Sequence, residues 1–126
     1  MENNTVENDF IKMTIVDGIL IGTYKTKYII DLEAAKKIVA DRKILCNGIS
    51  FPTIGLIEGV TTVTREARSF FGTEEGVIYM KSLAIIVGAP ISRAIGNFFL
   101  ILNRPKVPTK IFNSVEEAKA WSNNYK

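Results

Sequence analysis

The sequence contains no histidine, and only one of its 126 residues is a cysteine, Cys46. Without histidine, the commonest metal ligand and general base are missing, and neither a Ser-His nor a Cys-His catalytic pair can form. A single cysteine excludes an internal disulfide and any zinc site built from several cysteines. No phosphate-binding loop, dinucleotide motif or metal-ligand spacing is present either. We therefore expect a non-catalytic protein with no metal and no cofactor.

Long hydrophobic runs and clustered charge are also missing. The longest apolar runs have five residues, whereas a membrane-spanning helix needs about 20. The first nine residues carry three acidic side chains and lack the apolar core of a signal peptide. The 16 basic and 13 acidic residues give a net charge of +3, and the basic ones do not form the dense patch of a nucleic-acid-binding protein. We expect a cytoplasmic protein with no nucleic-acid partner and no integral membrane segment.

What the chain does have is enough apolar sequence for one folded domain, because hydrophobic residues make up 47% of it. Residues 1–9 are polar and are predicted to be flexible. Residues 10–16 alternate with a period of two, which indicates a strand. Asp17-Gly18 is a strong two-residue hairpin signal, so residues 19–24 are predicted to form the partner strand.

Helices and strands alternate after the hairpin. Apolar stripes and capping residues predict helices over 32–42, from the threonines at 61, 62 and 64 through 71, over 91–103 and after the capping box at 114–117. Gly72 interrupts the second of these, which restarts as a short second segment over 73–81. Apolar runs predict strands over 53–57, 83–87 and 109–112. This order implies right-handed crossovers. The predicted fold class is α/β: a single-layer, mixed, mostly parallel sheet of about five strands, with an N-terminal β-hairpin and about four helices.

Five stretches of the second half resemble a known group of proteins. They read TREARSFF at 64–71, LAIIV at 83–87, SRAIGNFFL at 92–100, KIFNS at 110–114 and EAKAW at 117–121. Over about residues 10–125 the chain resembles the small bacterial STAS/SEC14-like proteins of unknown function. Their fold is similar to that of anti-sigma factor antagonists and, more distantly, to that of CRAL-TRIO lipid-transfer domains. The resemblance implies a single STAS/SEC14-like domain over 10–126.

The resemblance makes the loop after the central strand a candidate site. Anti-sigma factor antagonists carry a phosphorylatable serine there, in an Asp-Ser-x-x-Gly-like motif at a helix N-terminus. The corresponding loop of this chain lacks that serine, and its candidate anion or phosphorylation residues are Glu58, Gly59, Thr61, Thr62 and Thr64. The helix dipole would favour a phosphoryl group on Thr61 or Thr62. Capping also explains a threonine at a helix start, and which threonine caps this helix stays open.

A second candidate loop follows the strand predicted over 83–87 and contains Gly88, Ser92 and Arg93. Ligands of parallel α/β sheets usually meet the carboxyl ends of the strands. Gly88 would let backbone N–H groups approach an anion, with Arg93 adding charge. The alternative is that the glycine only serves a tight turn from strand to helix.

The helix predicted over 91–103 has more apolar surface than one core stripe needs, and its candidate residues are Gly96, Asn97, Phe98, Phe99 and Leu100. Such a helix is either buried nearly all round or faces a partner. We favour a protein interface, with a two-fold homodimer as one form of it. The alternatives are a lipid-facing surface and a cover formed by residues 106–112.

The sequence as a whole thus predicts a non-catalytic protein-interaction or regulatory module. The alternative function is a module that binds a small apolar or lipid-like ligand between the sheet and the helix predicted over 91–103.

Overall fold

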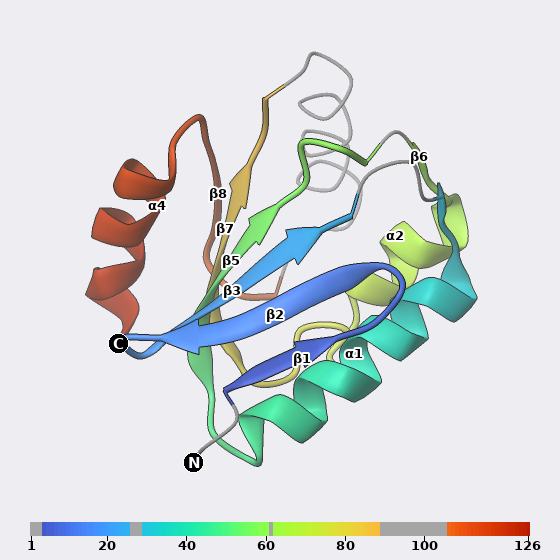
Figure 1. Ribbon diagram of the computed structural model, residues 1–126, viewed down its shortest axis with the longest axis horizontal. Helices are drawn as coiled ribbons and strands as arrows, with labels where there is room; N and C mark the ends of the chain where they lie inside the picture. The colour runs from blue at the N-terminus through green and yellow to red at the C-terminus, as the bar shows by residue number, and fades with distance from the viewer. Residues whose placement is uncertain (1–3, 26–28, 61, 89–105) are drawn as a thin grey trace.

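The computed structural model describes residues 4–25, 29–60, 62–88 and 106–126. These residues form a mixed six-stranded sheet with helices on both faces and a separate two-stranded sheet (Figure 1). The order in the main sheet is β1-β2-β3-β5-β7-β8. The strands are β1 (Thr5–Glu7), β2 (Ile11–Val16), β3 (Ile19–Tyr24), β5 (Phe51–Leu56), β7 (Met80–Ile86) and β8 (Thr109–Phe112). The small sheet pairs β4 (Ile29–Ile30) with β6 (Thr62–Val63) in parallel.

The predicted hairpin is confirmed. Strands β2 and β3 are antiparallel, and they are joined by Asp17 and Gly18 with φ angles of 52° and 76°. Positive φ at both central residues is what a tight hairpin turn of this kind requires, and Asp-Gly adopts it at low cost. From β3 onward the neighbouring strands β3, β5, β7 and β8 are all parallel, as the alternation of strands and helices predicts.

The N-terminal segment differs from the prediction. Residues 5–7 form β1, which pairs antiparallel with β2, so the main sheet has six strands rather than about five. Asn8 then holds the segment in place: its Oδ1 accepts hydrogen bonds from the backbone N–H groups of Phe10 and Ile11, and its Nδ2 donates to Asp41 at 2.8 Å. Residues 5–8 thus have defined pairing partners that the sequence did not predict.

Helix α1 (Leu32–Cys46) and helix α2 (Arg65–Phe71) lie on one face of the main sheet, and α4 (Val115–Ser122) lies on the other (Figure 1). Asp31 caps α1 as predicted, and the helix continues four residues beyond the predicted end at 42 before Asn47 ends it in the left-handed region. Ser114 caps α4 and a 3-10 turn follows at Asn123–Tyr125. The described residues thus hold three α-helices, and the helix predicted over 91–103 lies outside them.

The helical segment predicted over 73–81 is wrong. The chain makes consecutive turns there and enters β7 at Met80. Two backbone carbonyls in these turns, those of Gly76 and Ile78, accept hydrogen bonds from the Arg42 side chain. A contact between residues more than 30 positions apart has overridden a local helix signal.

Each face of the sheet has its own apolar core. The face under α1 and α2 buries Met13, Leu20, Ile30, Ile38 and Val60, and the opposite face packs Ile19, Ile54, Ala84 and Ile86 against Ala118 of α4. No helix of the described residues is long and apolar enough to cross a membrane.

Candidate ligand-binding site

Two glycines lie opposite each other in the middle of the main sheet. Gly22 of β3 and Gly55 of β5 are Cα partners in the parallel pairing of these strands. Because side chains alternate along a strand, both glycines fall on the face that α1 and α2 cover. A glycine weakens the interior of a strand, and it often marks a place where another group approaches the backbone closely.

Backbone conformation does not explain these two glycines, since neither has the positive φ that favours glycine. Steric crowding does not explain Gly55 either: a Cβ placed there would meet one atom within 4 Å, the Tyr24 Cε1 at 4.0 Å. A Cβ at Gly22 would lie 3.0 Å from Ile11 Cδ1, so that position is tighter. At Gly55 the missing side chain leaves open space above the sheet.

That space belongs to a cavity of about 100 Å³ between the sheet and the two helices. Its floor comes from the strands, one wall from α1 and α2, and the rest from the loop after β5 and the turns before β7. The lining is mainly apolar and includes Leu20, Ile38, Ile57, Val60, Phe71 and Ile85. An apolar cavity with a few polar groups at its edge is the usual form of a small-molecule site.

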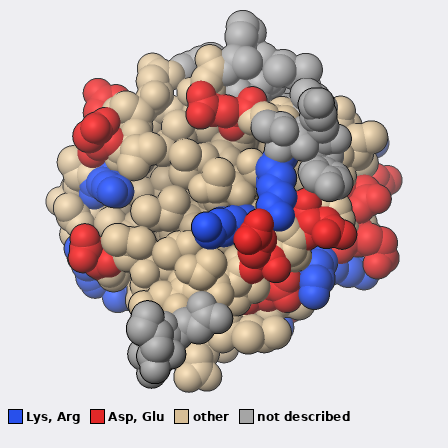
Figure 2. All heavy atoms as spheres, viewed as in Figure 1, with Lys and Arg blue, Asp and Glu red and all other residues tan. Residues whose placement is uncertain are grey.

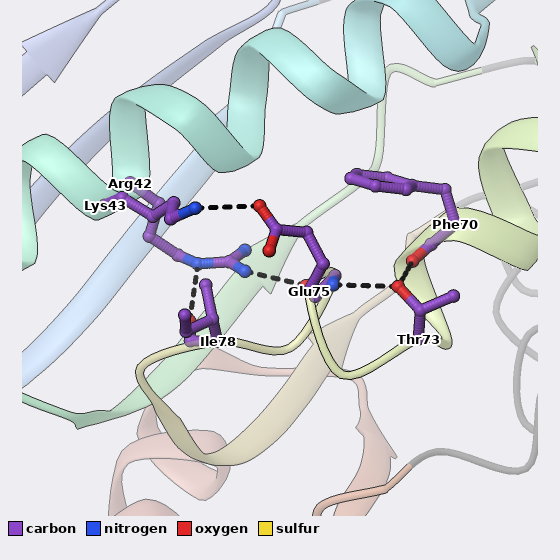
Figure 3. Close-up of polar contacts among 7 residues, drawn as sticks. Arg42, Lys43, Phe70, Thr73, Glu75 and Ile78 are labelled. Carbon is purple, nitrogen blue, oxygen red and sulfur yellow. Dashed lines mark hydrogen bonds and ion pairs between the residues drawn. The ribbon is translucent and has the colours of Figure 1, made fainter.

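Arg42 is the most deeply buried polar group of the lining, with 3% of its surface exposed. Its Nε donates to the carbonyl of Ile78 at 3.2 Å, and its Nη2 donates to the carbonyl of Gly76 at 2.7 Å. The neighbouring Lys43 instead pairs with Glu75 at 2.8 Å on the surface of the same turns (Figure 3). Among the described residues, none accepts a hydrogen bond from Nη1 of Arg42, and none forms an ion pair with it.

Tyr24 brings a second polar group to the cavity from the end of β3. Its hydroxyl has no hydrogen-bond partner in the described part of the chain. Burial raises the pKa of Tyr24 to about 12, and the positive charge of Arg42 lowers it by less. Burial likewise lowers the pKa of Arg42, which the nearby Tyr24 partly offsets. Below pH 10 the cavity therefore contains a neutral O–H donor and a guanidinium close enough to influence each other.

Arg68 of α2 adds a second positive charge to the lining. Its Nη1 donates to the backbone carbonyl of Val63 at 2.6 Å. Because Val63 also lines the cavity, this bond fastens the β6 segment to α2 at the cavity wall.

The first predicted loop lies at the carboxyl end of β5, and its residues have different roles. Thr64 caps α2 by accepting a hydrogen bond from the backbone N–H of Ala67 at 3.2 Å, which settles the choice that the sequence left open. Thr62 is exposed on β6, and Gly59 is half-buried in the turn between β5 and β6. Thr61 lies outside the described residues.

The structure brings Glu58 and Gly88 together, so the two predicted loops meet. A Cβ placed on Gly88 would collide with the carboxyl group of Glu58. Gly88 thus allows a close approach of the Glu58 side chain, and a carboxylate in this position disfavours an anion there. The other predicted residues of this loop and of the following helix lie outside the described part: Ser92, Arg93, Gly96, Asn97, Phe98, Phe99 and Leu100.

Sequence reasoning missed the glycine pair, Tyr24 and Arg42. The sequence signal for the floor of the cavity was an isolated glycine inside each of two predicted strands. For Arg42 the signal was its position four residues after Ile38, on the buried stripe of the helix.

Charges on the face drawn in Figure 2 are mixed in sign, with no extended basic area. Groups of three or more His, Cys, Asp or Glu side chains suited to a metal are absent from the described residues.

Residues 13–126 match the family described as "Domain of unknown function (DUF7793)". The chain belongs to this family. No curated protein matches it. Among solved structures, it is similar to an uncharacterized protein of the DUF3478 family from Shewanella loihica PV-4, which has a SpoIIAA-like fold. The TM-score is 0.63 at 13% sequence identity, over 93% of this chain and 98% of the other. The DUF7793 chain therefore has a STAS-type, SpoIIAA-like fold, as its resemblance implied.

Proposed function

We propose that this DUF7793 domain is a non-catalytic regulatory module that binds a small, mainly apolar ligand in the cavity between the sheet, α1 and α2. The observation that carries the proposal is Gly55, the register partner of Gly22, which leaves open space on the floor of a largely apolar cavity. The ligand would touch Ile57, Val60 and Val63. These residues belong to the loop that carries the phosphorylatable serine in the anti-sigma factor antagonists that the chain resembles. Occupancy of the cavity would thereby alter a surface that such folds use for regulation.

The proposed cavity replaces the location that the sequence indicated. The ligand-binding function predicted from the sequence placed a ligand between the sheet and the helix over 91–103, which lies outside the described residues. The cavity found here is instead lined by strand residues and by α1 and α2.

Benzene is a suitable first probe because it is compact and apolar, and an apolar cavity of about 150 Å³, somewhat larger than this one of about 100 Å³, takes it up. We expect benzene to shift the methyl signals of Leu20, Ile57 and Ile85 in a ¹³C-labelled sample and to leave Ile19, on the opposite face, unchanged. Gly55→Val places a side chain on the floor and should abolish the shifts. Thr23→Val is the matched control, because Thr23 is exposed and points to the other face of the same sheet. Shifts that persist in Gly55→Val would place the binding elsewhere and contradict the proposal.

A second function is docking of a protein partner, and Ile29 of β4 is one of four large apolar side chains that are exposed among the described residues. Ile29 has 60% of its surface exposed and pairs with Thr62, which is exposed as well.

A two-fold homodimer through residues 91–103 remains the form of the protein interface that the sequence predicts. Light scattering at micromolar concentration tests it: we expect a dimer for the wild type and a monomer for Leu100→Lys. A monomeric wild type would exclude the homodimer.

A further inference from the structure

The cavity offers two hydrogen-bond donors that the fold itself does not use. Nη1 of Arg42 and the hydroxyl of Tyr24 have no acceptor among the described residues, although the other donors of Arg42 are fixed to the carbonyls of Gly76 and Ile78. Buried polar groups are nearly always hydrogen-bonded, and a buried charge is normally paired. The fully buried unpartnered side-chain atoms of the described residues are the Oγ atoms of Ser82 and Ser122, so the two donors of the cavity both keep some accessible surface. The charge of Arg42, whose side chain is almost completely buried, therefore points to an acceptor that is not part of the described chain.

The charge defines the kind of acceptor. The described residues place no carboxylate in hydrogen-bond contact with Arg42, and its neighbour Glu75 is exposed and paired with Lys43. A guanidinium in apolar surroundings gains most from an anion, and a planar carboxylate matches its geometry. A phosphate carries more charge and needs more donors than these two side chains supply, and Nη1 of Arg68, the other cation of the lining, already donates to the Val63 carbonyl. A carboxylate therefore fits better.

The size of the cavity limits the rest of the ligand. A volume of about 100 Å³ is smaller than the 300–1,000 Å³ typical of sites for drug-sized ligands. It is also somewhat smaller than the cavity of about 150 Å³ that takes up benzene. By this comparison, an aliphatic chain of about four to six carbon atoms fills the space over Gly55.

We propose that the cavity binds a short-chain aliphatic carboxylic acid as its anion, with Nη1 of Arg42 and the hydroxyl of Tyr24 donating to the carboxylate and the aliphatic chain lying over Gly55. This inference rests on the proposed ligand-binding function and adds the chemical class of the ligand. The Tyr24 hydroxyl donates because it stays protonated, and the guanidinium provides the compensating charge. Neither donor has to leave a protein partner for the ligand to bind.

The experiment compares each acid with its uncharged amide, which has the same shape and lacks the charge. Butanoate, pentanoate, hexanoate and dodecanoate, and the corresponding amides, are titrated into the full-length protein at pH 7. Binding is followed by methyl chemical shifts and calorimetry. We expect each short acid to bind at least tenfold more tightly than its amide, with pentanoate or hexanoate the strongest and dodecanoate at least tenfold weaker.

Two variants test whether Tyr24 and Arg42 donate hydrogen bonds to the carboxylate of the ligand. Tyr24→Phe should weaken binding of both ligands but the acid more, because the hydroxyl's hydrogen bond to a charged carboxylate is stronger than its bond to an amide carbonyl; the acid should lose about three- to tenfold more affinity than the amide. Arg42→Lys keeps a positive charge but not the fixed geometry, and it should reduce the preference further; thermal unfolding shows whether this variant is folded. If Arg42→Lys is not folded, the test depends on Tyr24→Phe alone.

The outcomes separate the two proposals. Equal binding of acids and amides, both abolished by Gly55→Val, would overturn the carboxylate inference and leave the ligand-binding function standing. Absence of binding by benzene, acids and amides would overturn both. An acid affinity that Tyr24→Phe leaves unchanged would also contradict the inference, because the carboxylate would then lie away from the Tyr24 hydroxyl.

Discussion

The guanidinium of Arg42 donates a hydrogen bond to the backbone carbonyl of Gly76 at 2.7 Å, and this contact joins α1 to the turns before β7. A second bond to Ile78 makes the side chain a bridge between a helix and an irregular segment (Figure 3). The same segment packs tightly against the end of α2, because a Cβ on Gly76 would overlap the backbone of Phe70 and Phe71. One buried side chain therefore fixes both the path of the chain into β7 and one wall of the cavity.

Replacing Arg42 with methionine should lower the free energy of unfolding by about 2–4 kcal/mol. Methionine has a side chain of similar length but no guanidinium, so the variant leaves two buried carbonyls without donors. Lys43→Met is the matched control. It removes only a surface ion pair with Glu75, so its cost should stay below about 1 kcal/mol. Urea unfolding followed by the fluorescence of Trp121 measures both values. Equal effects of the two substitutions would contradict the bridging role of Arg42.

Gly76→Ala should destabilise the protein by about 2–3 kcal/mol, because the added methyl group meets backbone atoms that cannot move easily. Gly55→Ala is its internal control. The methyl group there enters open space and restricts the unfolded chain, so we expect a change between no effect and about 1 kcal/mol of stabilisation. Denaturant midpoints of the two variants check this difference in sign. A strongly destabilised Gly55→Ala would show that the floor of the cavity is already filled.

The fold could be predicted from the sequence wherever local chemistry decides it. The Asp17-Gly18 hairpin and the Ser114 cap of α4 both depend on residues a few positions apart. The turns over 73–79 could not be predicted, because their carbonyls are held by Arg42 from α1. The short edge strand β1 was missed because its three residues carry no periodic signal and depend on pairing with β2.

The candidate site was harder to predict than the fold, for the same reason. Gly22 and Gly55 are 33 positions apart, and only the register of β3 with β5 places them opposite each other. Each glycine alone indicates only a weak point in a strand. Of the loop residues chosen from the sequence, Glu58 and Gly88 lie just after β5 and β7 and pack on each other, and Thr64 is used for capping.

The cap assignment in the loop after β5 has its own test. Thr64→Ala removes the hydrogen bond to the N–H of Ala67 and should cost about 1 kcal/mol, the usual effect of losing an N-cap side chain. Thr62→Ala alters an exposed position on β6 and should change the stability by less than about 0.5 kcal/mol. Thermal and urea unfolding of both variants distinguish them. Similar losses at both positions would mean that Thr62 also stabilises the loop.

Ionisation of Tyr24 should make the protein less stable in alkali. The pKa of Tyr24 is about 12 in the folded protein against 10.0 for an ordinary tyrosine, because burial disfavours the charged phenolate. The folded state therefore holds this proton more tightly than the unfolded state. The stabilisation from the raised pKa is fully present below pH 10 and is lost between pH 10 and 12. The loss approaches about 2–3 kcal/mol at its upper end.

Tyr24→Phe isolates this effect, since the phenylalanine ring fills the same space and carries no titrating group. The free energy of unfolding of both proteins is measured in urea at pH 8, 10 and 11. The wild type should lose stability relative to Tyr24→Phe as the pH rises above 10, whereas the difference between the two proteins should be constant below it. Loss of lysine charge at high pH acts on both proteins and cancels in the comparison. A difference that does not change up to pH 11 would show that the hydroxyl is solvated, and it would remove Tyr24 as a buried donor in the cavity.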